Sequence, residues 1–447
     1  MKKIHFLGIG GVGMSALARW SMSNGYLISG YDREPSLVTK NLIKDGAKIY
    51  FESSYIDGVE SNDFTDLVVY SSAFKDDHPI LSFFINKNFD IKKRSSFLAE
   101  ISEKYDVIAI AGTHGKTTIS CILCHIFKES GIDCSAFIGG FSKNYNSNIL
   151  IGESKFMIIE ADEYDRSFLS LKPYLGLISA LDKDHSDTYL TYNEMLSAYI
   201  AFSEKCQNII VNNKIPGEIE FFKNSSMTSY SISNNHEEGY SIALFKKSEE
   251  ESIYNIYNGN NFLFNINLFN IAKHNVENYL AAICVSLELG IKSQDIISAI
   301  KSFKGIERRF EYHVNNENLT LIEDYAHHPV ELSALIYSAR DLHPSKKITL
   351  IFQPHLFSRT KDFLNEFAEI LSKVDRLVLL DIYAAREQPI SGFSINNLFS
   401  IIELKDKIIL DKKEISNYLS GLGCELILVV GAGDVNSIIP DLKSAFS

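Results

Sequence analysis

The chain has 447 residues, of which 45% are hydrophobic and 22% charged, an ordinary globular composition that allows about three domains. A formal net charge of −12 argues against nucleic acid or an anionic membrane surface as a broad partner. The six cysteines are too few for a disulfide framework, and the close pair Cys121 and Cys124 lies in an apolar helical pattern, which predicts buried thiols rather than a zinc or redox site.

A βαβ unit opens the chain. Residues 3–32 contain an apolar strand, a glycine turn, a helical pattern and a second short strand that ends at Asp32. The basic start, Lys2 and Lys3, resembles a secretory signal, but glycines and His5 interrupt the apolar run that follows. No run of about 18 apolar residues occurs. We therefore expect a cytoplasmic protein without a membrane span.

Strand and helix patterns alternate along the rest of the chain, which predicts an α/β fold of three tandem domains. Residues 213–262 carry no interpretable motif, and we expect loops and antiparallel edge strands there. The predicted domains are a Rossmann-like domain at 1–95, a central P-loop ATPase-like domain with a mainly parallel sheet at 96–305, and a Rossmann-like domain at 306–447. The main predicted strands are 66–73, 106–112, 156–162, 175–182, 319–326, 348–354, 376–383 and 424–434.

The first glycine turn follows a strand, opens a helix and precedes Asp32 by about twenty residues. Its glycines are Gly8, Gly10, Gly11 and Gly13. Such a turn brings backbone N–H groups and a helix N-terminus close to a diphosphate. It predicts a nucleotide diphosphate ligand, either NAD or another, although glycines also occur in such turns for close packing.

The second glycine turn, "AGTHGKTT", combines a flexible backbone with a phosphate-seeking lysine and a magnesium-binding hydroxyl. These features come from Gly112, Gly115, Lys116 and Thr117 at the start of a helix. The spacing departs from the usual P-loop, because Ile110 stands where the first glycine is expected. The turn predicts ATP as the ligand.

An ordered set of motifs then resembles the Mur ligases of peptidoglycan synthesis. The set is "GTHGKTT", "EADE", "DKDH", "HNVENYLAA", "ERRF" and "EDYAHHP", with "HFLGIGGVGMSALA" before it and "FQPHLFSRT" after it. The resemblance covers nearly the whole chain. It implies that ATP phosphorylates the lactyl carboxylate of UDP-N-acetylmuramate, that L-alanine attacks the acyl phosphate, and that Mg²⁺ or Mn²⁺ is required.

The resemblance also implies roles for individual residues. Expected catalytic residues are Lys116, Glu160, His185, Arg309 and Asp324, and expected metal ligands are Thr117, Glu160 and His185. Expected ATP contacts are Gly112, Thr113, His114, Gly115, Lys116, Thr117, Thr118, Asn275, Asn278, Arg309 and Asp324. Expected UDP-sugar contacts are Gly8, Gly10, Gly11, Gly13, Asp32, Ser71 and Ser72. Expected amino-acid contacts are His327, His328, His355 and Arg359.

Other residues near these motifs can be interpreted as functional or as purely structural. Asp162, Glu163 and Asp165 crowd one turn, where mutual repulsion favours a metal site. Arg308, next to Arg309, is more typical of a solvated or salt-bridged surface. The serines of "VVYSSA" are common helix caps. The late "GAG" at 431–433 predicts a turn without phosphate binding.

Three alternatives stay open on the sequence alone. A recycling ligase could join an intact tripeptide to the same sugar nucleotide. A dehydrogenase could bind NAD at the first loop beside a regulatory ATPase domain. A nucleotide-gated binding protein could use both loops without turnover.

Overall fold

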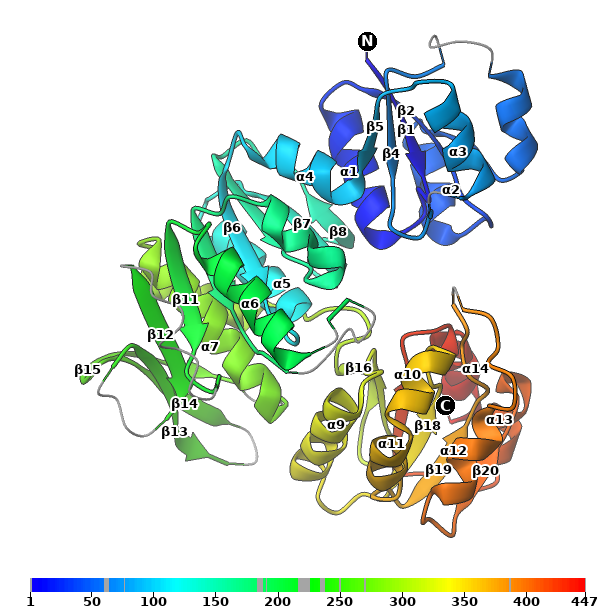
Figure 1. Ribbon diagram of the computed structural model, residues 1–447. Coiled ribbons are helices and arrows are strands. Elements are labelled where there is room, and N and C mark those ends of the chain that lie inside the picture. Colours follow the sequence, from blue (N-terminus) through cyan, green and yellow to red (C-terminus); the bar gives the residue numbers. More distant parts are fainter. Residues whose placement is uncertain are drawn as a thin grey trace. The chain divides into compact units, whose positions relative to one another are not determined.

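The computed structural model describes residues 2–59, 64–75, 77–182, 188–189, 191–215, 226–233, 238–248, 251–268, 271–385 and 387–446. The chain divides into two compact units (Figure 1). One comprises residues 1–269 and 277–305, and the other comprises residues 270–276 and 306–447.

The leading part of the first unit is a five-stranded parallel sheet of order β3-β2-β1-β4-β5. Strand residues alternate between its two faces. Ile4 and Phe6 face one apolar cluster, whereas Leu7 joins another. The elements are β1 (Lys3–Leu7), α1 (Val12–Ser23), β2 (Leu27–Tyr31), α2 (Leu37–Lys44), β3 (Lys48–Tyr50), η1 (Ser53–Gly58), β4 (Leu67–Tyr70), α3 (Pro79–Asn86), β5 (Ile91–Lys93) and α4 (Arg94–Ser102).

His5, which interrupts the apolar run of β1, is a buried core histidine with both ring nitrogens hydrogen bonded. Its Nδ1 lies 2.8 Å from Ser29 Oγ and its Nε2 lies 2.8 Å from Tyr55 Oη. Burial lowers the pKa of His5 to about 3, so the ring is neutral at neutral pH. A polar residue therefore fits inside this sheet because its polar atoms are satisfied.

The rest of the first unit is built on a ten-stranded sheet, of order β15-β14-β13-β12-β11-β10-β6-β9-β7-β8. Helices α5 and α6 accompany its central strands in Figure 1. The elements are β6 (Asp106–Ala111), α5 (Lys116–Glu129), β7 (Ser135–Ser142), β8 (Ser147–Leu150), β9 (Phe156–Glu160), η2 (Tyr164–Ser170), β10 (Leu175–Ile178), α6 (Tyr192–Ser203), β11 (Asn208–Asn212), β12 (Met227–Ile232), β13 (Tyr240–Lys247), β14 (Ser252–Asn258), β15 (Asn261–Asn267), α7 (Lys273–Glu288) and α8 (Ser293–Ser302).

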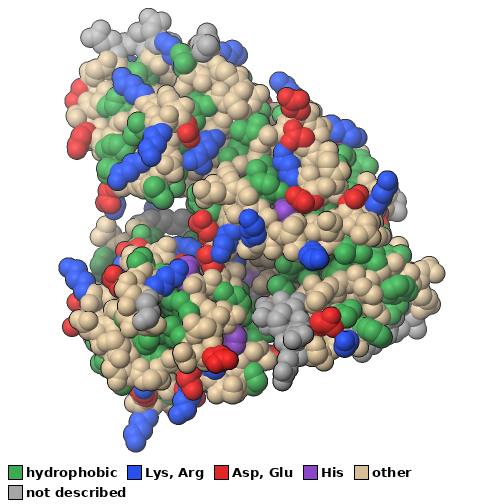
Figure 2. Space-filling view, turned by 180° about the vertical axis from the view of Figure 1, so that it is seen from behind, with side chains coloured by type: hydrophobic (Ala, Val, Ile, Leu, Met, Phe, Trp, Pro, Cys, Tyr) green, Lys and Arg blue, Asp and Glu red, His purple; other side chains and the backbone are tan. Residues whose placement is uncertain are grey.

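The polar stretch 213–262 was predicted to contain loops and antiparallel edge strands. Strands β14 and β15 confirm this, but β12 and β13 continue the parallel order of β11. The sequence shows no helical crossover between β12 and β13, which parallel neighbours normally require. In Figure 2 hydrophobic side chains are gathered at this edge of the sheet, where Phe245 is 69% exposed and Phe262 is 54% exposed.

The second unit contains a six-stranded sheet of order β16-β17-β21-β18-β19-β20. Antiparallel β16 lies at one edge and the other strands are parallel. The elements are β16 (Glu311–Asn315), β17 (Thr320–Asp324), α9 (Pro329–Leu342), β18 (Ile348–Phe352), α10 (Phe357–Asp362), α11 (Leu364–Leu371), β19 (Arg376–Leu379), α12 (Ile395–Ile401), β20 (Lys407–Ile409), α13 (Lys412–Ser420), β21 (Leu426–Val430), η4 (Val435–Ile438) and α14 (Ile439–Ala445).

Helices cover both faces of this sheet, as its nearly continuous apolar strands require. On one face, strand residues such as Leu428 and Phe352 pack with Leu335 of α9 and Phe367 of α11. On the other face, the remaining strand residues pack with α13 and α14. The predicted α/β class is therefore confirmed, and none of the helices in the described ranges is long and apolar enough to cross a membrane.

Truncation of Leu428, a fully buried residue of the central strand β21, should destabilise the second unit. We expect Leu428→Ala to lower its free energy of unfolding by about 2–5 kcal/mol, because the lost apolar contacts leave a cavity. Ile401→Ala, at a position 41% exposed, should cost less than about 1 kcal/mol. Denaturant titration followed by circular dichroism would measure both, and equal losses would contradict the assignment of the core.

Candidate active site

The second glycine turn connects β6 to α5 and takes a backbone conformation that only glycine adopts readily. Gly112 has φ of 133° and Gly115 has φ of 82°. Asn278 of α7 lies directly over Gly115, since a Cβ atom at that position would come within 2.3 Å of Asn278 Oδ1. The structure therefore brings the predicted ATP contact Asn278 to the loop, and Asn275 lies one turn earlier on the same helix.

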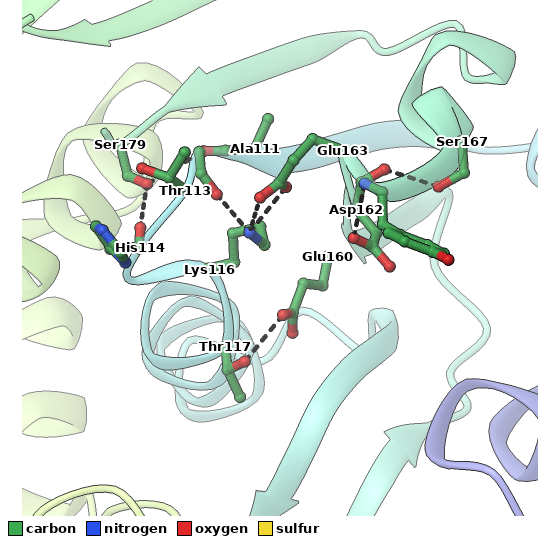
Figure 3. A network of polar contacts seen from close by, with 12 residues as sticks. Ala111, Thr113, His114, Lys116, Thr117, Glu160, Asp162, Glu163, Ser167 and Ser179 are labelled. Carbon is green, nitrogen blue, oxygen red and sulfur yellow. Dashed lines mark hydrogen bonds and ion pairs between the residues drawn. The ribbon is translucent and has the colours of Figure 1, made fainter. Parts of the chain in front are cut away.

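Lys116, the first residue of α5, is held by a buried carboxylate (Figure 3). Its Nζ lies 2.9 Å from Glu163 Oε1 and 2.8 Å from Oε2, and it also donates to the carbonyl of Gly112. Glu163 is fully buried, and Tyr189 Oη donates to its backbone carbonyl. Burial lowers the pKa of Lys116, but Glu163 and the other nearby carboxylates outweigh it, so the pKa is raised and the lysine stays charged.

Two predicted metal ligands, Thr117 and Glu160, lie together beside the loop. Thr117 Oγ1 donates to Glu160 Oε1 over 2.9 Å, and the backbone N–H of Gly139 donates to Glu160 Oε2 over 2.6 Å. A hydroxyl and a carboxylate are oxygen donors of the kind that Mg²⁺ prefers. The third predicted ligand and catalytic residue, His185, lies outside the described residues, so its role stays a prediction.

The two residues between the loop glycines are held by hydrogen bonds from the segment that directly follows β10. Ser179 Oγ donates to the backbone carbonyl of His114, and the backbone N–H of Asp182 donates to Thr113 Oγ1 over 3.1 Å. His114 Nε2 lies 3.3 Å from Asp182 Oδ2. Thr118 follows Thr117 on α5. The loop is thus rigidly supported at the carboxyl edge of the sheet, where open α/β folds bind ligands.

Each carboxylate of the acidic turn after β9 has a basic partner from the protein. Glu163 pairs with Lys116, Asp162 Oδ2 lies 3.5 Å from Arg94 Nη2, and Asp165 Oδ2 lies 3.3 Å from Lys93 Nζ. Basic side chains of the protein thus compensate the mutual repulsion of these carboxylates, and metal binding at this turn stays a prediction. These pairings join residues far apart in sequence, so no local motif indicated them.

The first glycine turn lies between β1 and α1, at the carboxyl edge of the leading sheet. Its backbone is held by Asp32, whose Oδ2 accepts from the N–H of Gly10 over 2.7 Å. Gly11 donates to the carbonyl of Gly8. Ser71 lies next to Gly8, whereas Ser72 is exposed to solvent. Neither serine caps a helix, because the N-cap residue of α3 is His78. The last glycine of the turn, Gly13, lies in the first turn of α1.

In the second unit, Asp324 at the end of β17 fixes the loop that carries Arg309. Its carboxylate accepts from the N–H groups of Phe310 over 2.7 Å and Ala326 over 2.8 Å. Arg309 stacks on Tyr325, with its guanidinium carbon 5.1 Å from the ring centroid. Burial raises the pKa of Asp324 to about 6, although Arg309 and the two N–H donors lower it.

Arg308 is a partly buried structural anchor rather than a solvated surface residue. Its Nε lies 2.9 Å from Glu323 Oε1, and its Nη2 donates to the carbonyls of Gly431 and Gly433 over 2.6 and 2.9 Å. The salt-bridged interpretation is therefore the right one. Among the described residues, one cluster has the side chains and spacing to bind a metal ion, and it consists of Glu311, His313 and Glu323 beside Arg308. Arg308 already compensates the charge of Glu323.

Three of the predicted amino-acid contacts lie near one another in the second unit. The His327 and His355 rings meet edge to face with centroids 5.9 Å apart. The pKa of His327 is lowered, mainly by burial and also by the nearby Arg359, whereas Glu331 acts in the opposite direction. His328 instead caps α9, its Nδ1 accepting from the N–H of Val330, and packs against Phe363. A structural role therefore accounts for the position of His328, and ligand binding by it stays a prediction.

Three family profiles match the chain in succession. "Mur ligase family, catalytic domain" matches residues 3–106, "Mur ligase middle domain" residues 110–286, and "Mur ligase, glutamate ligase domain" residues 308–433. A UDP-N-acetylmuramate–L-alanine ligase of Christiangramia forsetii is 36% identical, over 100% of this chain and 98% of that protein. One of Porphyromonas gingivalis is 37% identical, over 99% and 98%.

Solved structures give the same correspondence. The UDP-N-acetylmuramate–alanine ligase of Thermotoga maritima matches with a TM-score of 0.84 and 26% identity, over 100% of this chain and 99% of that one. A murein peptide ligase from Psychrobacter arcticus matches with a TM-score of 0.76 over 100% and 98%, but its 20% identity supports a common fold alone.

Asp324 should make the stability of the second unit depend on pH. Its pKa is about 6 when folded and about 3.9 when unfolded, so it favours the folded state most below pH 4, and this contribution is lost as the pH rises through 6. Asp324→Asn removes the titration. The stability of wild type relative to the variant should therefore fall by about 1–3 kcal/mol from pH 4 to pH 7.

Denaturant titrations at pH 4, 5.5 and 7 would measure this difference. Asp362→Asn, at an exposed position on α10, serves as the control and should leave the pH profile unchanged. A difference between wild type and Asp324→Asn that stays constant over this range would contradict the raised pKa.

Proposed function

We propose that this chain, which belongs to the Mur ligase family, joins L-alanine to the lactyl carboxylate of UDP-N-acetylmuramate with hydrolysis of ATP to ADP and phosphate. The observation that carries the proposal is the end-to-end match to ligases of that name at 36–37% identity. The resemblance predicted from the motifs is thereby confirmed. The product would be a peptidoglycan precursor.

The reaction divides among the three sheets. We assign residues 1–95 to the UDP-sugar, 96–305 to ATP and 306–447 to the amino acid. Two anionic nucleotides need two separate cradles, which accounts for two glycine turns in one chain. The recycling ligase, which takes a tripeptide, shares this architecture, so the amino-acid substrate decides between them.

Activation of the carboxylate is a phosphoryl transfer, in which positioning and charge neutralisation dominate. A lactyl carboxylate oxygen attacks the γ-phosphorus, the bond from that phosphorus to the bridging oxygen breaks, and ADP leaves. Lys116 is the positively charged side chain at this loop, and when ATP binds it would leave Glu163 and pair with the phosphates instead. Thr117 and Glu160 would hold Mg²⁺ or Mn²⁺, which supplies further charge neutralisation when bound.

The amine of L-alanine then attacks the acyl carbon, and phosphate leaves with the former carboxylate oxygen. The amine must lose a proton to complete this step. His327 is suited to accept it, because its lowered pKa keeps the ring neutral. The Nδ1 atom lies 3.0 Å from the carbonyl of Tyr325 and donates there, which leaves Nε2 as the acceptor. Arg359, which also acts on His327 electrostatically, offers a clamp for the alanine carboxylate.

A phosphate-release assay tests the function directly. The purified protein should release phosphate only when ATP, UDP-N-acetylmuramate and L-alanine are all present with Mg²⁺. In competition, L-alanine should be used in preference to the L-alanyl tripeptide. Release that does not depend on both the sugar nucleotide and L-alanine would refute the proposal, and preference for the tripeptide would favour the recycling ligase.

Lys116→Ala should lower kcat by at least about 100-fold, because it removes the charge expected to stabilise the transferred phosphoryl group. Binding of UDP-N-acetylmuramate should be unchanged, since its cradle is the first glycine turn. Lys128→Ala, on the same helix, is the control and should keep near-wild-type activity. Loss of sugar-nucleotide binding in Lys116→Ala would show that the two loops were assigned to the wrong ligands.

A further inference from the structure

Arg94 lies against the first glycine turn although it is about eighty residues away in sequence. It is the first residue of α4, directly after β5, at the carboxyl edge of the leading sheet. Its guanidinium covers Gly13 in the first turn of α1, since a Cβ atom at Gly13 would come within 2.5 Å of Arg94 Nη1. Because glycine has no side chain, the guanidinium can pack directly against the backbone of the loop.

The position of Arg94 is electrostatically unfavourable without an anion. The N-termini of α1 and α4 both carry partial positive charge, and neither helix has an acidic residue in its first turn. A guanidinium placed beside both ends is repelled by both. Its ion-pair partner among the described residues is Asp162, with Nη2 and Oδ2 3.5 Å apart and both side chains partly exposed. So long a pair compensates the charge only weakly.

We propose that Arg94 binds the diphosphate of the sugar nucleotide at the first glycine turn, and that Asp162 is the counter-ion it gives up when this ligand arrives. The proposal rests on the proposed function, which places a uridine diphosphate at this turn. A guanidinium offers paired N–H donors that match phosphate oxygens. The diphosphate supplies the anion that the two helix ends and the arginine together require.

The proposal also links the two nucleotide loops. Asp162 lies in the turn that follows β9, two residues after Glu160 and one before Glu163, the partner of Lys116. Release of Asp162 from Arg94 would add negative charge beside the ATP loop when the sugar nucleotide is bound. The acidic turn would then attract cations more strongly once the first substrate is in place.

A purely structural ion pair between the leading and central sheets is the competing explanation. The adjacent pair of Lys93 and Asp165 is of that kind, with both side chains about half exposed. The two explanations predict opposite changes in ligand affinity when Asp162 is removed. If the pair is only structural, removing either Arg94 or Asp162 harms the protein similarly, whereas a ligand-binding Arg94 is freed by removal of Asp162.

Isothermal titration of the full-length protein with UDP distinguishes them. We expect Arg94→Met to weaken UDP binding by roughly 10- to 100-fold, the range of a charge-assisted hydrogen bond. Lys93→Met, the control on the same connector, should change binding less than about threefold. Asp162→Asn should tighten binding by up to about fivefold. Uridine, which has no phosphates, should bind wild type and Arg94→Met equally, and UDP-N-acetylmuramate should follow UDP.

Equal UDP affinity in Arg94→Met and Lys93→Met would overturn the inference, and so would similar weakening in Arg94→Met and Asp162→Asn. If Arg94→Met does not fold, Arg94→Lys replaces it, with an expected loss of about three- to tenfold because the paired donors are missing. Wild-type protein that does not bind UDP would refute the proposed function itself, a result distinct from unchanged binding by the variants.

Discussion

A largely buried lysine beside a nucleotide loop needs an anion next to it, because an uncompensated charge with little access to water is costly. In this protein Glu163 meets that need for Lys116. The same carboxylate keeps the lysine charged against the effect of burial. In the proposed reaction the phosphates of ATP replace Glu163 as the partner. The acidic turn after β9 therefore supplies the carboxylate that compensates the lysine of α5.

At the first glycine turn, too, carboxylates of the protein pair with groups that are expected to contact phosphate. The Asp32 carboxylate accepts a hydrogen bond from the N–H of Gly10, in the turn where a diphosphate is expected. Arg94, at the same turn, has Asp162 as its partner. Protein carboxylates thus stand at both loops where phosphate groups are expected. Because the protein has a net charge of −12, binding of two anionic substrates calls for cations placed locally at these two loops.

The sequence predicted the parts of this arrangement that are local. The strand, glycine turn and helix around Lys116 follow from periodicity and turn chemistry, and the structure has them where expected. It did not predict partners joined across the fold, such as Glu163 for Lys116 or Glu323 for Arg308, because no spacing rule relates residues on different structural elements. Short β8, β16 and β20 were also missed, since a few residues carry too little alternation to stand out.

The account depends on the carboxylate of one nucleotide meeting the terminal phosphate of the other. A crystal structure with a non-hydrolysable ATP analogue and UDP-N-acetylmuramate tests this most directly. We expect a lactyl carboxylate oxygen within roughly 3–3.5 Å of the γ-phosphorus, and Lys116 Nζ on the phosphates in place of Glu163. A carboxylate that points away from that phosphorus, with Lys116 still paired to Glu163, would contradict the account.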